Sequence, residues 1–266
     1  MEKEDTVIET EQKSPEIFEP KDKGFFSLLG ESFKFFLLHL PAIATIVVPV
    51  FLVVEFLVPL LSKLIPDLAG DLTGSELLDG FINEGIRAII IELIAAIIGG
   101  IAWIATIRVI ASSIRGEKIP PIQAMKDGTA MLPMFIVTAT LYYLIVIIGF
   151  ILLFVPGVIL FIYFVFWQFS YVLRGKGAIS ALSYSWDLVS GNFVRVSLNV
   201  VGIWIVMYVL NNFVIGLIAS NVAILVGEDD SIPYLIVNAI FTALGKVFEG
   251  VRIIFLLSLF KDLEKS

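Results

Sequence analysis

The chain has no cysteine, a single histidine and few charges for its length. The absence of cysteine among 266 residues excludes disulfides, thiolate catalysis and metal sites built on cysteine. His39 is the one histidine, so a catalytic or metal site that needs a histidine pair is excluded as well. The net charge is −7 and no basic stripe is visible, which argues against a nucleic-acid partner. The sequence therefore predicts no cofactor, no metal and no enzyme activity, because no other catalytic motif takes the place of these residues.

Hydrophobic residues dominate what is present. They make up 58% of the chain, charged residues only 16%, and the mean hydropathy is +0.98. An ordinary soluble domain has about 45 to 50% apolar and about 25% charged residues. The composition therefore predicts an all-α integral membrane protein.

The first 23 residues differ from the rest of the chain. They hold eight acids and four lysines and show almost no apolar periodicity. Such a segment buries too little surface to offset the entropy of ordering it. We expect residues 1–23 to form a disordered cytoplasmic tail and residues 24–266 to form a single membrane domain.

Six stretches are long and apolar enough to cross a bilayer, which takes roughly 20 residues for about 30 Å of hydrocarbon. The fourth stretch is short but follows Val155-Pro156-Gly157, a sequence typical of a tight reversal. The fifth is too long for one perpendicular span, so it must tilt, extend into water or break near Asn211-Asn212. The predicted spans are 42–61, 82–111, 134–155, 156–173, 193–226 and 234–260.

The distribution of Lys and Arg predicts the orientation, because cytoplasmic flanks collect these residues. Fourteen of them fall on the side of both termini, and only Lys63 and Arg87 fall on the other side. We expect a multi-pass protein of the plasma membrane with both termini in the cytoplasm. The fourteen are Lys3, Lys13, Lys21, Lys23, Lys34, Arg108, Arg115, Lys118, Lys126, Arg174, Lys176, Arg195, Lys261 and Lys265.

The segment before each odd-numbered span repeats one pattern. In each segment four residues, apolar except for one threonine, recur at positions i, i+3, i+7 and i+10. The three sets are Phe26, Leu29, Phe33 and Phe36; Ile122, Met125, Thr129 and Leu132; and Ile179, Leu182, Trp186 and Val189. This spacing predicts three amphipathic helices that lie on the cytoplasmic surface of the membrane. The chain then divides into three parallel repeats of surface helix and hairpin, at about 25–114, 119–175 and 177–262. The alternative is that these segments are the amphipathic linkers of any multi-pass protein.

One region resembles a known family. Its residues are Val155-Pro156-Gly157-Val158, a span that ends in Arg174-Gly175-Lys176-Gly177, and the run Ala178-Ile-Ser-Ala-Leu-Ser-Tyr-Ser-Trp-Asp-Leu-Val-Ser-Gly-Asn192. Together they resemble the glycerophosphodiester phosphodiesterase membrane-domain superfamily and related six-span proteins, over roughly 150–200. The resemblance implies a six-helix membrane domain of unknown role. The phosphodiesterase barrel with its metal-binding histidine pair has no counterpart here, so its activity is not carried over.

Charges inside the predicted spans are the candidate site residues, since each costs at least a few kcal/mol at the bilayer centre without a partner. In the sixth span, Lys246, Glu249 and Arg252 follow one another at i, i+3 spacing, so they can form ion pairs within the helix. On this interpretation their role is structural. Glu92 and Lys246 fall at a similar depth, which predicts an ion pair between hairpins one and three. The alternative is a polar cavity that binds an ion, a proton or a lipid headgroup. The cluster is Glu55, Glu92, Lys246, Glu249 and Arg252.

A second set of charges flanks the predicted surface helices. Cations near the membrane surface attract anionic lipid headgroups by about 1 kcal/mol each. We therefore expect a non-enzymatic module that contacts lipids or anchors a soluble or membrane protein partner, with transport of a small solute, ion or proton as the alternative. The expected lipid contacts are Lys34, Arg115, Lys118, Lys126, Arg174 and Lys176.

Overall fold

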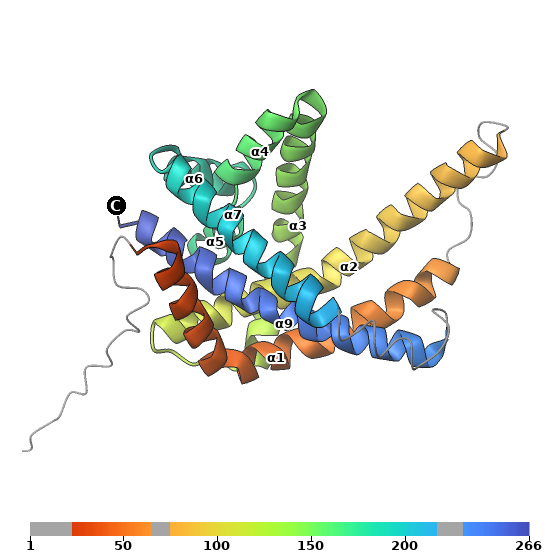
Figure 1. The fold of residues 1–266 in the computed structure, drawn as a ribbon, viewed down its shortest axis with the longest axis horizontal. Coiled ribbons are helices and arrows are strands. Elements are labelled where there is room, and N and C mark those ends of the chain that lie inside the picture. The colour runs from red at the N-terminus through yellow and green to blue at the C-terminus, as the bar shows by residue number, and fades with distance from the viewer. Residues whose placement is uncertain (1–22, 65–74, 217–230, 266) are drawn as a thin grey trace, which may run out of the picture.

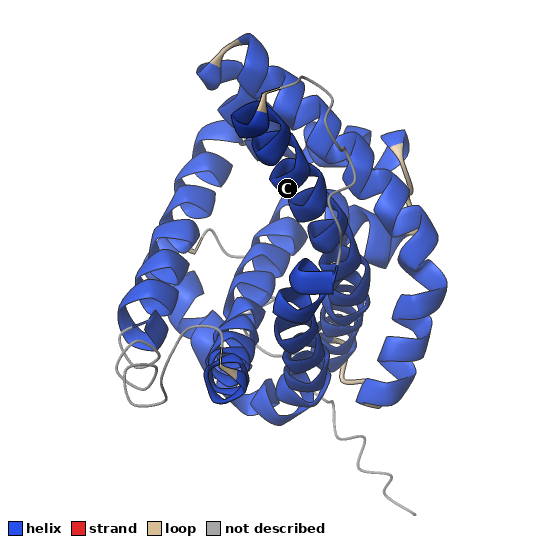
Figure 2. Ribbon diagram, turned by 90° about the vertical axis from the view of Figure 1, so that its right-hand side faces the viewer, coloured by secondary structure: helices blue, strands red, loops and turns tan. Residues whose placement is uncertain are grey.

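The computed structural model describes residues 23–64, 75–216 and 231–265, and every regular element in these ranges is a helix (Figures 1 and 2). Residues 1–22 of the predicted tail and residues 217–226 of the fifth predicted span lie outside the described residues. The elements are α1 (Phe25–Leu64), α2 (Glu76–Ile114), α3 (Pro121–Leu152), α4 (Phe154–Tyr163), α5 (Trp167–Arg174), α6 (Ile179–Ser190), α7 (Phe193–Val209), the π-helix η2 (Leu210–Ile215) and α9 (Ile232–Leu263).

Five helical segments are long and apolar enough to cross a membrane, which confirms an all-α, membrane-embedded protein. Each overlaps one of the first five predicted spans. The sixth predicted span lies in α9, which is not among the five. The segments are Phe25–Leu61, Leu93–Ile114, Pro121–Leu152, Phe154–Arg174 and Phe193–Asn212.

Helix α9 lies at the centre of the molecule and packs antiparallel to α1 along much of its length (Figure 1). Its second half is buried almost without interruption, with Phe255 and Phe260 fully enclosed. Gly250 allows the two helices to approach, because a Cβ at this position would meet the Phe36 ring at 3.1 Å. The core is therefore built around α9, and the other helices cover it.

The predicted surface helices are not all separate elements. The stretches that begin at Phe26 and Ile122 are the first parts of the continuous helices α1 and α3, although α1 changes direction along its length (Figure 1). The third is the separate helix α6, and its apolar face packs on the protein, with Leu182 and Val189 buried. Contact with the protein thus takes the place of part of the expected contact with lipid.

The reversal between the third and fourth spans occurs at Leu153, two residues earlier than the sequence predicted. Leu153 is extended, with φ −161° and ψ 143°, and α4 begins directly after it. Pro156 therefore falls in the first turn of α4, where a missing N–H costs no helical hydrogen bond. Gly149 and Gly157 face each other across the hairpin, and a Cβ on Gly149 would lie 3.0 Å from the Gly157 Cα.

The fourth predicted span is interrupted, because α4 ends at Tyr163 and α5 begins at Trp167. Ser185 of α6 satisfies the backbone at this break: its hydroxyl accepts from Phe166 N at 3.0 Å and donates to Tyr163 O at 2.8 Å. The fifth span keeps regular geometry to Val209 and continues as the π-helix η2, at the position where the sequence allowed a break.

Candidate functional site: a polar pocket beside α9

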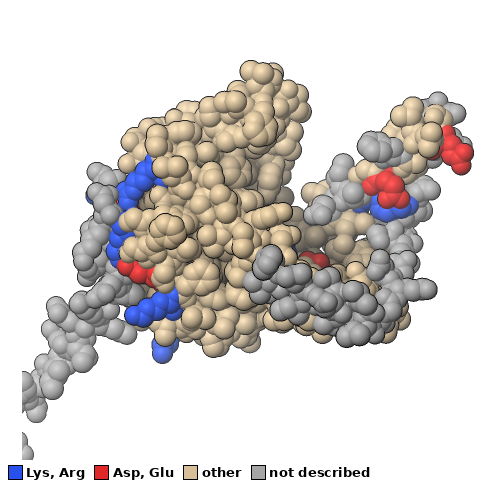
Figure 3. Space-filling view, viewed as in Figure 1, with Lys and Arg blue, Asp and Glu red and all other residues tan. Residues whose placement is uncertain are grey.

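A pocket of about 570 Å³ lies where α1, α2, α3, α5 and α9 meet. Its walls are mainly apolar, and the surface is hollowed between the outer part of α2 and the α3–α4 hairpin (Figure 3). The polar and charged residues of the lining come from all five helices. They are Glu55, Trp103, Thr106, Thr140, Tyr143, Gln168, Lys246, Glu249 and Arg252.

Helix α9 contributes three charged residues to the pocket at i, i+3 spacing. Arg252 Nε lies 2.6 Å from Glu249 Oε2, as the sequence spacing allowed, but the angle is too poor for a hydrogen bond. The Arg252 guanidinium also lies 5.1 Å from the Trp103 ring and 5.3 Å from the Trp204 ring. Arg252 is therefore held by one carboxylate and two aromatic faces.

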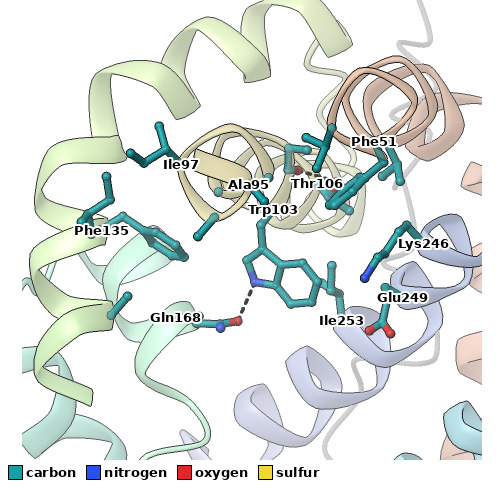
Figure 4. A pocket seen from close by; sticks show the side chains of 18 of the residues that line it. Phe51, Ala95, Ile97, Trp103, Thr106, Phe135, Gln168, Lys246, Glu249 and Ile253 are labelled. Carbon is teal, nitrogen blue, oxygen red and sulfur yellow. Dashed lines mark hydrogen bonds between the residues drawn. The ribbon is translucent and has the colours of Figure 1, made fainter. Parts of the chain in front are cut away.

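Lys246 differs from Arg252, although it lies on the same helix and lines the same pocket. Its Nζ lies 5.7 Å from the centre of the Phe51 ring, and among the described side chains it is paired with no carboxylate. Figure 4 shows the ammonium directed from α9 toward the pocket interior, where Trp103 lies. Lys246 thus presents a positive charge to the cavity.

The two remaining residues of the predicted charge cluster lie on α1 and α2. Glu55 lines the pocket from α1, one turn beyond Phe51, and has an interaction of its own. Glu92 belongs to α2, but its side chain lies outside the described part of the structure. Its pairing with Lys246 therefore stays a prediction, whereas Glu55, Lys246, Glu249 and Arg252 are brought together in one lining.

Sequence reasoning missed the polar group at the inner wall of the pocket. The indole N–H of Trp103 donates to Gln168 Oε1 at 2.5 Å, which joins α2 to the first turn of α5 (Figure 4). Gln168 is the one amide in the apolar stretch 156–173, and this was the available signal. The break between α4 and α5 places it at the pocket.

The other predicted group of cations lies at the end of the molecule where α1 begins, α2 joins α3, α5 joins α6, and α9 ends (Figures 1 and 3). We call this the basic end. Three of its cations are exposed and have no carboxylate partner among the described residues: Lys34, Lys118 and Lys126. Arg115 pairs with Glu117 at 3.0 Å, and Lys176 lies over the Tyr184 ring at 4.5 Å.

The C-terminal end of α9 is fixed to the basic end by ion pairs. Arg174 of α5 donates two hydrogen bonds of 2.7 Å to Glu264, and Tyr184 of α6 donates a third. Arg195 of α7 pairs with Asp262. Burial of the Glu264 carboxyl opposes its ionisation, but the hydrogen bonds from Arg174 and Tyr184 and the charge of Lys261 outweigh this and lower its pKa from the ordinary 4.5.

The described residues contain no group of three His, Asp or Glu side chains that could hold a metal ion. The pocket instead offers the ammonium of Lys246, the carboxylate of Glu55, the Glu249–Arg252 pair, the amide of Gln168 and aromatic walls. Apolar walls with a few polar and charged groups are the composition of small-molecule binding sites.

Residues 75–263 match DUF7847, a domain of unknown function. The chain belongs to this family. No curated protein and no solved structure matches the chain. The matched region of this DUF7847 protein runs from the start of α2 to the end of α9, so it includes four of the five helices that form the pocket.

Proposed function

We propose that this DUF7847 protein is a non-enzymatic, multi-pass module of the cell membrane that contacts anionic lipid headgroups through its basic end. In this proposal α9 forms a sixth span, the three hairpins are parallel repeats, and both termini face the cytoplasm. The resemblance of residues 150–200 to the glycerophosphodiester phosphodiesterase membrane-domain superfamily supports the six-span arrangement. The excess of Lys and Arg at the basic end supports the orientation.

The observation that carries the lipid role is the set of three exposed cations without carboxylate partners, Lys34, Lys118 and Lys126. Large apolar side chains are exposed on the same helices, with Leu38 one turn from Lys34 and Ile122 one turn from Lys126. Cations next to an apolar surface bind at the headgroup level of a bilayer. At about 1 kcal/mol per cation, the three favour anionic over zwitterionic lipid by about 3 kcal/mol together.

Native mass spectrometry of the protein released from membranes of mixed lipid composition tests this role. Replacing Lys34, Lys118 and Lys126 together by Gln should reduce the anionic lipids retained per protein. The matched control replaces the same three residues by Arg, which keeps the charge and should retain lipid as the wild type does. Equal retention by the Gln and wild-type proteins would refute the proposal. Retention of a protein partner in place of lipid would favour the scaffolding role.

A second candidate function is transport of a small solute or ion. The interruption between α4 and α5 favours it, because transporters build their sites at discontinuous helices. Flux into proteoliposomes that stops on Lys246→Met but persists after the Lys→Gln changes at the basic end would support transport.

A further inference from the structure

The pocket combines apolar walls with a single cation that has no carboxylate partner among the described side chains. Of the two cations in its lining, Arg252 is occupied by Glu249 and by the rings of Trp103 and Trp204. Lys246 forms no ion pair with a described side chain, and its Nζ lies over the ring of Phe51. Glu55, the other acid of the lining, has an interaction of its own. Lys246 is therefore the cation of the lining that no described carboxylate contacts.

An ammonium in a low-dielectric site is stabilised by an opposite charge, and it costs several kcal/mol when none is present. Phe51 supplies only part of this, since a cation–π contact contributes about 0.5 to 2 kcal/mol. An anionic group placed within the cavity would form a charge-assisted hydrogen bond with Lys246. The local electrostatics thus select for a negatively charged ligand.

The rest of the lining selects for an apolar body on that ligand. Aromatic and aliphatic side chains from α1, α2, α3 and α5 form the walls. Among them are Phe51, Ile97 and Phe135 (Figure 4). The volume of about 570 Å³ falls within the range of about 300 to 1,000 Å³ found for small-molecule sites. A hydrated inorganic ion would leave most of this apolar surface without a partner.

We propose that the pocket binds an amphiphilic anion, with its carboxylate or phosphate on Lys246 and its hydrocarbon body against the walls from α1, α2 and α3. This site deepens the proposed lipid-binding function, on which it rests, by adding an internal lipid site to the surface contacts. The shared chemistry fits two sources, a free fatty acid and an anionic phospholipid. Gln168 and Tyr143 are positioned to fix the orientation of the bound molecule.

Two tryptophans in the lining, Trp103 and Trp167, provide the readout. A fatty acid with bromine on its chain quenches tryptophan fluorescence on contact, so titration into the purified full chain in detergent measures binding. Wild-type protein should be quenched at saturation, and Lys246→Met should bind at least about tenfold more weakly, as expected when one partner of a desolvated charge pair is removed. Lys246→Arg should retain the affinity. Arg87→Gln, which removes a cation of α2 outside both the pocket lining and the basic end, should bind like the wild type.

The methyl ester of the same brominated acid separates charge from hydrophobicity without any mutation, so the test holds even if Lys246→Met fails to fold. The ester should bind the wild type at least about tenfold more weakly than the acid. Equal binding of acid and ester, or equal binding of the acid by wild type and Lys246→Met, would overturn the proposal. Quenching by a brominated anionic phospholipid but not by the fatty acid would identify the phospholipid as the source.

The pocket and the basic end give separable results. If the three Lys→Gln changes reduce lipid retention but leave quenching by the brominated acid unchanged, the surface contacts and the pocket are separate lipid sites. Loss of quenching in Lys246→Met with normal lipid retention would locate the anion in the pocket alone.

Discussion

The basic end and the pocket both contain charged residues from α9 or its C-terminal cap, but the charges have different partners in the two regions. At the basic end, Asp262 and Glu264 are each matched by an arginine from a neighbouring helix. In the pocket, Glu249 and Arg252 pair within one helix with poor hydrogen-bond geometry, and Lys246 has no carboxylate partner among the described residues. The first arrangement joins helices, whereas the second leaves charge available to a ligand.

This difference follows from what each charge contacts. The pairs at the basic end join α5, α6 and α7 to the end of α9, so they act as structural links between elements distant in sequence. Among the described residues, Lys246, Glu249 and Arg252 form no ion pair with another helix. A charge in an apolar region costs free energy when no well-placed opposite charge offsets it. A charged residue inside a membrane-embedded region is by default a candidate for a functional site.

Ser185→Ala should produce the largest effect, because this buried residue of α6 satisfies two backbone groups at the break before α5, the helix that carries both Gln168 of the pocket and Arg174 of the basic end. Its hydroxyl satisfies Phe166 N and Tyr163 O at the α4–α5 break, where Ser185 is fully buried. Removing it leaves both backbone groups without a partner and should lower the free energy of unfolding by about 2 to 4 kcal/mol. Chemical denaturation in detergent measures this. Ser183→Ala, an exposed position on the same helix, should change little, and an equal loss in both variants would contradict the assigned role.

Glu264→Gln should have the next largest effect, since it removes the charge at the centre of the basic end. The change weakens two hydrogen bonds from Arg174 and the pair with Lys261 at 3.2 Å. Because Arg174 is partly exposed, solvent screens the interaction, and the expected loss of stability is about 1 to 2 kcal/mol. Glu117→Gln is the matched control, because its pair with Arg115 is exposed at both partners. An equal loss of stability in the control would show that the link between Arg174 and the end of α9 contributes no more than an exposed ion pair.

The pH dependence of stability sharpens the same comparison. The pKa of Glu264 is lower in the folded protein than its ordinary value of 4.5, so the unfolded chain binds the proton more readily. The stabilisation is therefore fully present above about pH 4.5 and is lost as the pH falls through the lower, folded value. Thermal unfolding of wild type and Glu264→Gln should differ at neutral pH and converge in acid. A difference that stays constant down to strongly acidic pH would rule out this linkage.

The sequence predicted the membrane class and the helical fold because both follow from long apolar runs, which are local. It also allowed the change of geometry near Asn211-Asn212, where the π-helix lies. It did not predict the break between α4 and α5. Residues Phe164–Phe166 contain no Gly or Pro, and the break is satisfied by Ser185, which comes from another helix. No local pattern carries that information.

The candidate site was predictable to the extent that charges in apolar runs are conspicuous. Lys246, Glu249, Arg252 and Glu55 stand out in the sequence, and the structure places them in one lining. Their different partners were not predictable, because Arg252 is held by Trp103 and Trp204 from two other helices. Gln168 was overlooked for a similar reason, since only the tertiary fold brings it to Trp103.

Trp103→Phe should produce the smallest effect and bears most directly on the pocket. The change keeps an aromatic face beside Arg252 but removes the N–H that donates to Gln168. Because the Gln168 amide lines the cavity, water or a ligand replaces the lost donor, and the expected loss of stability is about 0.5 to 1.5 kcal/mol.

Trp204→Phe is the matched control: it alters the second ring beside Arg252, at 5.3 Å, without removing a bond to Gln168. If the pocket is built for binding rather than for stability, Trp103→Phe should weaken binding of the brominated acid more than Trp204→Phe does, with the concentration for half-maximal quenching of the remaining Trp167 as the measure in both variants. Denaturation in detergent should separate the two variants only slightly. A large difference in stability with no difference in binding would instead show that the bond between Trp103 and Gln168 is a structural link between helices, like the ion pairs of the basic end.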